Sequence, residues 1–231
     1  MSATPAEARR ERLVEVYREA SGCTLCPLAQ SRTNVVFGAG DANADLMFIG
    51  EAPGAEEDRQ ALPFVGRAGA FLNELLAGIG LRREDVFVAN VLKCRPPGNR
   101  DPQPVEIETC RPYLLSQVEL IEPKVIATLG NFATKLITAD QTGITRVRGT
   151  PQVHTLGERT LKVFPILHPA AILRNPGQRG LMDEDFAALA GLLEEPPLEQ
   201  LEVSPPDLPE EPAPQPVPQQ VRDDQLDFFT S

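Results

Sequence analysis

The chain has 231 residues, of which 42 % are apolar, and this is enough for one domain with a sizeable core. Its 33 acidic residues exceed its 22 basic residues, and the resulting net charge of −11 argues at first against nucleic acid as a partner. No apolar run approaches the roughly 20 residues of a membrane span, and Met1 to Ala20 contains no apolar block of signal-peptide length, so we expect a cytosolic, cytoplasmic protein without a membrane partner.

Helical and strand patterns alternate along the chain. In chain order, the apolar periodicity predicts a helix over 5–20, a strand over 46–49, a helix over 68–79, a strand over 86–91, a helix over 105–121, a strand over 125–129, a helix over 131–137, a strand over 162–167 and a helix over 182–193. Such alternation is typical of a mainly parallel sheet with helices on both faces. We therefore expect an α/β fold, a three-layer α/β/α sandwich with a central, mainly parallel four-stranded sheet.

The acidic excess is concentrated at the C-terminal end. Residues 194–231 carry a net charge of −9 and nine of the 23 prolines, which leaves a net charge of −2 for the preceding 193 residues. A segment of this composition cannot bury enough apolar surface to offset its ordering entropy. We therefore expect a folded domain over 1–195 and a disordered acidic tail over 196–231, and the objection to nucleic acid weakens.

The tail ends on an apolar cluster. Gln225, Leu226, Asp227, Phe228 and Phe229 follow the proline-rich stretch and precede only two further residues. Large apolar side chains on an acidic tether are typical of an anchor for a partner's pocket, although a tail that folds back on its own domain is the simpler alternative. The five residues resemble the pentapeptide with which bacterial DNA-repair and replication proteins bind the sliding clamp.

The four cysteines form one close pair and one separated pair. Cys23 and Cys26 are spaced as a chelating hairpin, whereas fifteen residues separate Cys94 from Cys110. Disulfides are unexpected in a chain without a secretion signal. Four thiolates suit zinc, but zinc ribbons build both halves from close pairs, and this spacing suits an iron–sulfur cluster equally well. The residues alone predict a metal centre and leave its identity open.

Polar residues stand where three of the predicted strands end. Glu51 follows the first strand, Asn90 closes the second, and His168 follows the last. Ligands of parallel α/β folds bind at this edge of the sheet. Individually, each residue has a simpler reading as a turn former, a cap or a structural histidine.

These segments together resemble the family 4 uracil-DNA glycosylases, the iron–sulfur branch of the uracil-DNA glycosylase superfamily, over roughly Ser21 to Leu193. The resemblance rests on the cysteine spacing and on four motifs, which are GEAPG at 50–54, LPFVGRAG at 62–69, VANVLKCRPPGNRDP at 88–102 and HPAAILRNP at 168–176. It implies a structural [4Fe-4S] cluster with four ligands, Cys23, Cys26, Cys94 and Cys110.

The resemblance also implies a role for each pocket residue. Uracil flipped out of DNA stacks on Phe64, and the Asn90 amide accepts from its N3–H and donates to its O4. His168 hydrogen-bonds O2 of the departing base, and the Ala52 backbone contacts uracil. Glu51 orients water, acts as a general base or stabilises the cationic sugar. Basic side chains near these loops are expected to contact DNA, namely Arg67, Lys93, Arg95, Arg100, Arg146, Arg148, Arg174 and Arg179.

The predicted function is therefore base excision repair of deaminated cytosine by a monomeric, monofunctional glycosylase that leaves an abasic site. A related iron–sulfur protein that cross-links to uracil-DNA is the nearest alternative, but it carries Gln at the position of Ala52 and a histidine-bearing insertion, whereas residues 175–181 contain no histidine. A non-catalytic module that recruits repair partners through its tail is the second alternative.

Overall fold

The computed structural model describes residues 5–200. The greater part of the predicted tail, including the apolar cluster at 225–229, lies outside the described residues. Within residues 5–200, no helix is long and apolar enough to cross a membrane.

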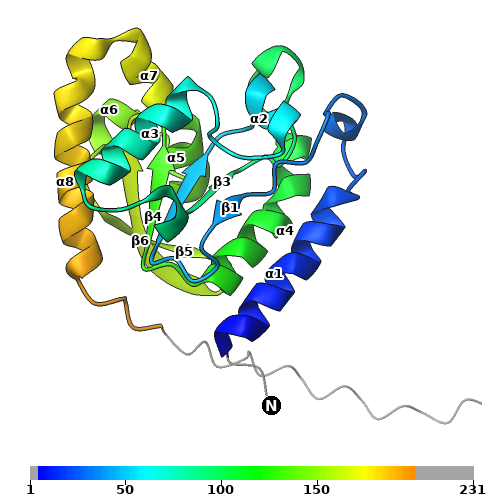
Figure 1. The fold of residues 1–231 in the computed structure, drawn as a ribbon, viewed down its shortest axis with the longest axis horizontal. Coiled ribbons are helices and arrows are strands. Elements are labelled where there is room, and N and C mark those ends of the chain that lie inside the picture. Colours follow the sequence, from blue (N-terminus) through cyan, green and yellow to red (C-terminus); the bar gives the residue numbers. More distant parts are fainter. Residues whose placement is uncertain (1–4, 201–231) are drawn as a thin grey trace, which may run out of the picture. The chain divides into compact units, whose positions relative to one another are not determined.

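A six-stranded mixed sheet forms the centre of the domain (Figure 1). Its strands run in the order β1-β3-β2-β4-β6-β5. The four inner strands are parallel, with Phe48 of β2 aligned with Val88 of β3 and with Ala127 of β4. The strands are β1 (Ala39–Gly40), β2 (Leu46–Gly50), β3 (Phe87–Asn90), β4 (Val125–Leu129), β5 (Gln152–Leu156) and β6 (Arg159–Ile166).

Helices cover both faces of the sheet. The α-helices of the described chain are α1 (Pro5–Ser21), α2 (Ala55–Gln60), α3 (Arg67–Gly78), α4 (Pro104–Ile121), α5 (Asn131–Thr138), α6 (Ile144–Val147), α7 (Pro169–Arg174) and α8 (Arg179–Glu194). Short 3-10 turns complete the described chain at Pro27–Gln30, Arg83–Asp85, Pro97–Asn99 and Pro176–Gln178.

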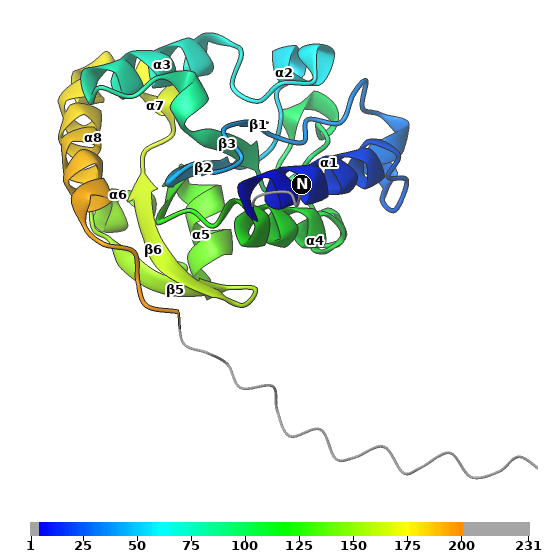
Figure 2. The same cartoon turned by 60° about the horizontal axis from the view of Figure 1, so that its bottom comes forward.

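The alternation of side chains along β2 explains the three layers. Leu46 and Phe48 pack into one core with α3, α7 and α8, whereas Met47 and Ile49 pack into a second core with α1, α4 and α5. Successive residues of a strand point to opposite faces, so a fully apolar strand requires cover on both sides. Figures 1 and 2 show α3 and α8 on one face and α1 and α4 on the other. The predicted three-layer sandwich is confirmed.

The main differences from the predicted elements lie at the edges of the sheet. All four predicted strands are present and parallel, but β1 and β5 add two antiparallel edge strands that the sequence did not predict. β1 has only two residues, and β5 alternates partly buried and exposed side chains as an outer strand does. Neither strand carries the continuous apolar run that marked the inner ones.

Candidate active site

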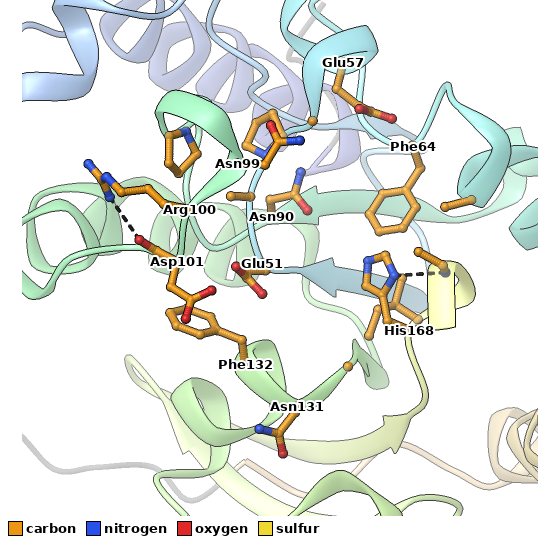
Figure 3. A pocket seen from close by; sticks show the side chains of 18 of the residues that line it. Glu51, Glu57, Phe64, Asn90, Asn99, Arg100, Asp101, Asn131, Phe132 and His168 are labelled. Carbon is orange, nitrogen blue, oxygen red and sulfur yellow. Dashed lines mark hydrogen bonds between the residues drawn. The ribbon is translucent and has the colours of Figure 1, made fainter. Parts of the chain in front are cut away.

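A cavity of about 600 Å³ opens beyond the carboxyl ends of the inner strands (Figure 3). The loops after β2, β3, β4 and β6 each contribute to its walls. Parallel strands bring their carboxyl ends to one edge, which is why residues far apart in sequence meet here. The predicted residues that line the cavity are Glu51, Ala52, Phe64, Asn90, Arg100, His168 and Arg174.

The lack of a side chain at Gly50 leaves room for the side chains of Asn90 and Phe64. A Cβ atom at position 50 would lie 2.4 Å from Oδ1 of Asn90 and 2.9 Å from the Phe64 ring. Asn90 is 2 % exposed, and within the described residues its side-chain amide has no hydrogen-bond partner in the protein. A buried amide without a partner is poised to bind a polar ligand that enters the cavity.

The loop that carries Phe64 is fixed from two sides. Oε1 of Glu57 accepts hydrogen bonds from the backbone N–H groups of Val65 and Gly66, at 3.1 and 3.2 Å. Gly69 of α3 lies so close to the loop that a Cβ atom there would be 1.7 Å from the Phe64 carbonyl oxygen. Phe64 itself has a φ of +53°, which is uncommon for a non-glycine residue. These contacts hold the aromatic ring at the cavity wall.

His168 is held as a neutral imidazole with one defined tautomer. It caps α7, and its Nδ1 accepts a hydrogen bond of 3.1 Å from the Ala170 N–H, which assigns the ring proton to Nε2. Burial lowers its pKa to about 4, with a further lowering by the Arg174 charge and an opposing effect of Glu57. The ring lies 5.7 Å from that of Phe64 between centroids, so both face the same space (Figure 3).

Glu51 faces a second carboxylate. Burial raises the pKa of Glu51, and the nearby Asp101 charge raises it further. Figure 3 shows both side chains at the same end of the cavity, beyond Asn90. The loop that bears Asp101 is anchored by Arg100, which donates to both Glu106 carboxylate oxygens at 2.9 and 2.5 Å. Glu51 is therefore an acid of raised pKa on the side of the cavity opposite His168.

Some residues that line the cavity were not predicted from the sequence. Asp101 was not predicted, and neither were Glu57, Asn131 and Phe132, although all four line the space. Asn131 and Phe132 begin α5 directly after β4, so the rule that strand ends carry ligands identifies their position. Glu57 lies on the short helix α2 and Asp101 on the loop before α4, and neither position follows a buried strand directly.

The four cysteines gather beside β3 and α4. Cys94 and Cys110 are buried in one small cluster against which Cys26 packs, and Cys23 acts electrostatically on Cys110. Burial raises the pKa of Cys94 to about 11, and Arg32, which donates to its Sγ atom at 3.4 Å, opposes this shift. Within residues 5–200, no set of three or more metal-ligating side chains has the arrangement for a single bound ion. The donor chemistry, four thiols without carboxylate or imidazole, fits an iron–sulfur cluster.

Some of the basic residues predicted to contact DNA have accessible side chains, whereas others form ion pairs within the protein. Arg67 and Arg174 are exposed, and Arg95 donates to Oδ1 of Asn99 at 2.7 Å beside the cavity. The Arg148 side chain is 17 % exposed and forms a two-bond ion pair with Asp185, at 2.9 and 2.7 Å. Arg148 is thus already occupied by an internal partner.

The prediction that Lys93 contacts DNA is wrong. Its side chain is fully buried, and its Nζ atom donates to protein oxygens inside the domain. Lys93 stands between Leu92 and Cys94 in the sequence, and its charge alone led to the prediction of an exposed side chain.

Known proteins agree with this fold. The model of the "Uracil DNA glycosylase superfamily" matches residues 37–190. A type-4 uracil-DNA glycosylase of Archaeoglobus fulgidus is 47 % identical over 79 % of this chain and 94 % of its own length. Type-4 uracil-DNA glycosylases of Thermotoga maritima and Sulfurisphaera tokodaii are 49 % and 46 % identical, over 72 % and 78 % of this chain and 86 % and 84 % of their own lengths.

The fold and the matched residues define a protein of the uracil-DNA glycosylase superfamily. Within that superfamily, the chain belongs to the type-4 uracil-DNA glycosylases.

Proposed function

We propose that the protein hydrolyses the N-glycosidic bond between uracil and deoxyribose in DNA and leaves an abasic site. Membership of the type-4 uracil-DNA glycosylases supports the activity. One observation carries the assignment of roles: Asn90, Phe64 and His168 surround one half of a cavity that has Glu51 at its other end.

Uracil is recognised by its hydrogen-bonding edge. In our proposal, the free Asn90 amide accepts from N3–H and donates to O4, while Phe64 stacks on the base and backbone groups at Ala52 line its edge. Cytosine reverses both polarities at this edge and would leave buried groups unpaired, so a site of this kind rejects it strongly. Stacking is worth about 1–3 kcal/mol per base and offsets part of the cost of flipping the nucleotide out of the duplex.

Bond cleavage separates charge, and the two ends of the cavity suit the two charges. Nε2–H of neutral His168 donates to uracil O2 and stabilises the anion that leaves. A neutral donor gives up no proton to the base, so the stabilisation is electrostatic. The Glu51 carboxylate faces the sugar, where it stabilises the cationic carbon and orients the water that adds to C1′.

The cysteines are proposed to hold a [4Fe-4S] cluster through Cys23, Cys26, Cys94 and Cys110. These residues would hold the cluster between the loop after α1, the segment after β3 and helix α4, where it would stabilise the fold and take no part in bond cleavage. DNA contacts are proposed for Arg67, Arg95 and Arg174. Arg148 is left out because Asp185 occupies its guanidinium.

The C-terminal segment is proposed to be a tether that binds the bacterial sliding clamp through Gln225, Leu226, Phe228 and Phe229. We further propose that the enzyme is a monomer and acts in the cytoplasm. Deletion of residues 225–229 should abolish association with the clamp in a pull-down and leave activity on short oligonucleotides unchanged. Equal clamp binding by the truncated protein would end this proposal.

The activity is tested by incubating the holoenzyme with a single-uracil oligonucleotide, without added divalent metal. We expect free uracil in the supernatant and strand breakage only after alkali treatment, and we expect both to be lost in His168→Ala. An intact strand after alkali refutes the proposal. A protein–DNA adduct that survives denaturing electrophoresis indicates the cross-linking alternative, and binding without uracil release indicates the recruitment module. A visible absorption spectrum of the same sample distinguishes iron–sulfur from zinc.

A further inference from the structure

Lys93 lies between the base-reading Asn90 and the cysteine Cys94 in the sequence, and it is 1 % exposed. Lysine is almost never fully buried unless its amine is well partnered, because removing the group from water costs several kcal/mol. No ion pair joins it to a carboxylate within the part of the chain that the structure describes. We therefore expect this buried amine to have a specific structural role.

The amine connects two elements that flank the active site. Nζ donates to the Asn90 carbonyl oxygen at 2.8 Å and to Oε1 of Gln117 at 2.5 Å. Gln117 belongs to α4, and its Nε2 donates in turn to the Phe37 carbonyl at 2.9 Å. The Phe37 ring lies 5.9 Å from Nζ and covers the amine. A continuous chain of bonds therefore runs from the Asn90 backbone to α4.

The main chain of the same residue is held from the cysteine side. The Lys93 carbonyl accepts from the Val36 N–H at 2.7 Å, and the Lys93 backbone acts on the Cys110 thiol, whose pKa it lowers. These contacts belong to the backbone, so a change of the Lys93 side chain leaves them in place. The side chain forms separate bonds to the Asn90 carbonyl oxygen, which closes the turn, and to Gln117.

The turn at Asn90 is where the strand leaves the sheet. Val91 and Leu92 still donate to the carbonyls of Gly50 and Glu51, at 2.9 and 3.0 Å. The Asn90 carbonyl receives its bond from the Lys93 side chain, three residues ahead. The peptide between Asn90 and Val91 is therefore held at both ends, by the Val91 N–H and by the Lys93 amine. The amine adds to the Val91 bond in opposing a rotation of this peptide, which would redirect the Asn90 side chain.

We propose that Lys93 is a positioning residue for uracil recognition, because its buried amine ties the Asn90 backbone to Gln117 and fixes the direction of the Asn90 amide. This inference rests on the proposed function. It assigns Lys93 no contact with substrate.

A double-mutant cycle on the holoenzyme tests the proposal. Lys93→Met keeps the length of the side chain and removes both Nζ bonds, and Asn90→Ala removes the amide. Misplacement of a positioning group by about 1 Å costs up to about 10²-fold in rate, so we expect Lys93→Met to lower single-turnover uracil release at least about tenfold. In the Asn90→Ala background the same change should lower it less than about twofold, because residues that act through one another are not additive.

Two further variants make the result specific. Gln117→Met removes one end of the bridge and should show the same non-additivity with Asn90→Ala, which keeps the test available if Lys93→Met does not fold. Lys135→Met on α5 makes the same chemical change away from the turn and should leave uracil release unchanged. The visible absorption per protein should be equal in all variants, which separates loss of position from loss of the metal centre.

The outcomes distinguish this inference from the proposed function. If the wild-type enzyme releases no uracil, the proposed function is wrong and the role of Lys93 is wrong with it. If the wild type is active and Lys93→Met matches it, only the role of Lys93 is overturned. An equal loss in the wild-type and Asn90→Ala backgrounds also overturns it, because a general structural defect would then explain the effect.

Discussion

At the scale of single residues, the cavity separates two titrating groups. His168 has its pKa lowered to about 4 by burial, so it loses its proton well below neutral pH and stays a neutral donor above it. Glu51 has its pKa raised by burial and by Asp101, so it gains a proton at a higher pH than an ordinary glutamate. The lowered pKa keeps His168 a neutral donor, and the raised pKa makes the Glu51 carboxylate a stronger base than an ordinary glutamate.

The pH dependence of uracil release tests this arrangement. As pH falls through the raised pKa of Glu51, the carboxylate becomes neutral and the rate should fall. Asp101→Asn removes the neighbouring negative charge, which lowers the Glu51 pKa and should move this acid limb to lower pH. The measurement is the pH profile of single-turnover cleavage in the two proteins. Superimposable profiles would show that Asp101 does not act on Glu51.

Sequence reasoning located the site residues that follow a buried strand. Glu51, Asn90 and His168 each stand at such an end, and the structure brings them to one cavity. Asp101 lies at the cavity on a loop that the ion pair between Arg100 and Glu106 anchors, and this tertiary contact has no local signal. Lys93 was misplaced for the same reason, since charge in the sequence does not reveal burial.

At the scale of elements, the start of α3 is fitted to the Phe64 loop. Gly69→Ala should lower the free energy of unfolding by about 1–3 kcal/mol, the usual cost of overpacking, because a Cβ atom would lie 1.7 Å from the Phe64 carbonyl. It should also slow uracil release, since Phe64 must move. Urea unfolding and single-turnover cleavage measure the two effects.

Gly78, at the other end of the same helix, is the matched control. Nothing lies within 4 Å of a Cβ atom there, so Gly78→Ala should stabilise the protein by about 0.5–1 kcal/mol through helix propensity alone. If both variants behave alike, the close packing at Gly69 has no role in the position of Phe64.

The inner elements were predictable because their apolar runs are long. The strand over 125–129 coincides with β4, and the helix over 105–121 differs from α4 by one residue. The edge strands β1 and β5 escaped prediction because they owe their structure to pairing with β3 and β6. The short helices α2 and α7 likewise depend on loop contacts more than on periodicity.

At the scale of the whole molecule, the four cysteines lie on segments that are distant in the sequence, and the proposed cluster would join these segments. A metal centre that binds only the folded chain stabilises it, so removal of one ligand should weaken the domain as well as the centre. Cys110→Ser should lose visible absorption and unfold at a lower temperature than the wild type. Equal melting of the two proteins would contradict a structural role for the centre.

The net charge of the whole chain is the sum of two unequal parts, a strongly acidic C-terminal segment and a nearly neutral remainder. Residues 194–231 carry −9 of the total −11, and the remaining residues carry −2. Local basic side chains at the cavity, such as Arg174, are therefore compatible with a DNA substrate despite the acidic composition. The sum over the chain gave no information about the site.

We propose that Asn90 selects uracil in this cavity, and the base selectivity of the enzyme tests this role. The measurement is kcat/KM for release of uracil and of cytosine from the same position of one oligonucleotide, with wild type and Asn90→Asp. A site built to pair with a hydrogen-bonding edge rejects the wrong partner by about 10⁴-fold or more. We predict a ratio of that order for the wild type and its collapse in Asn90→Asp, which cannot donate to O4. An unchanged ratio in the variant would contradict the account.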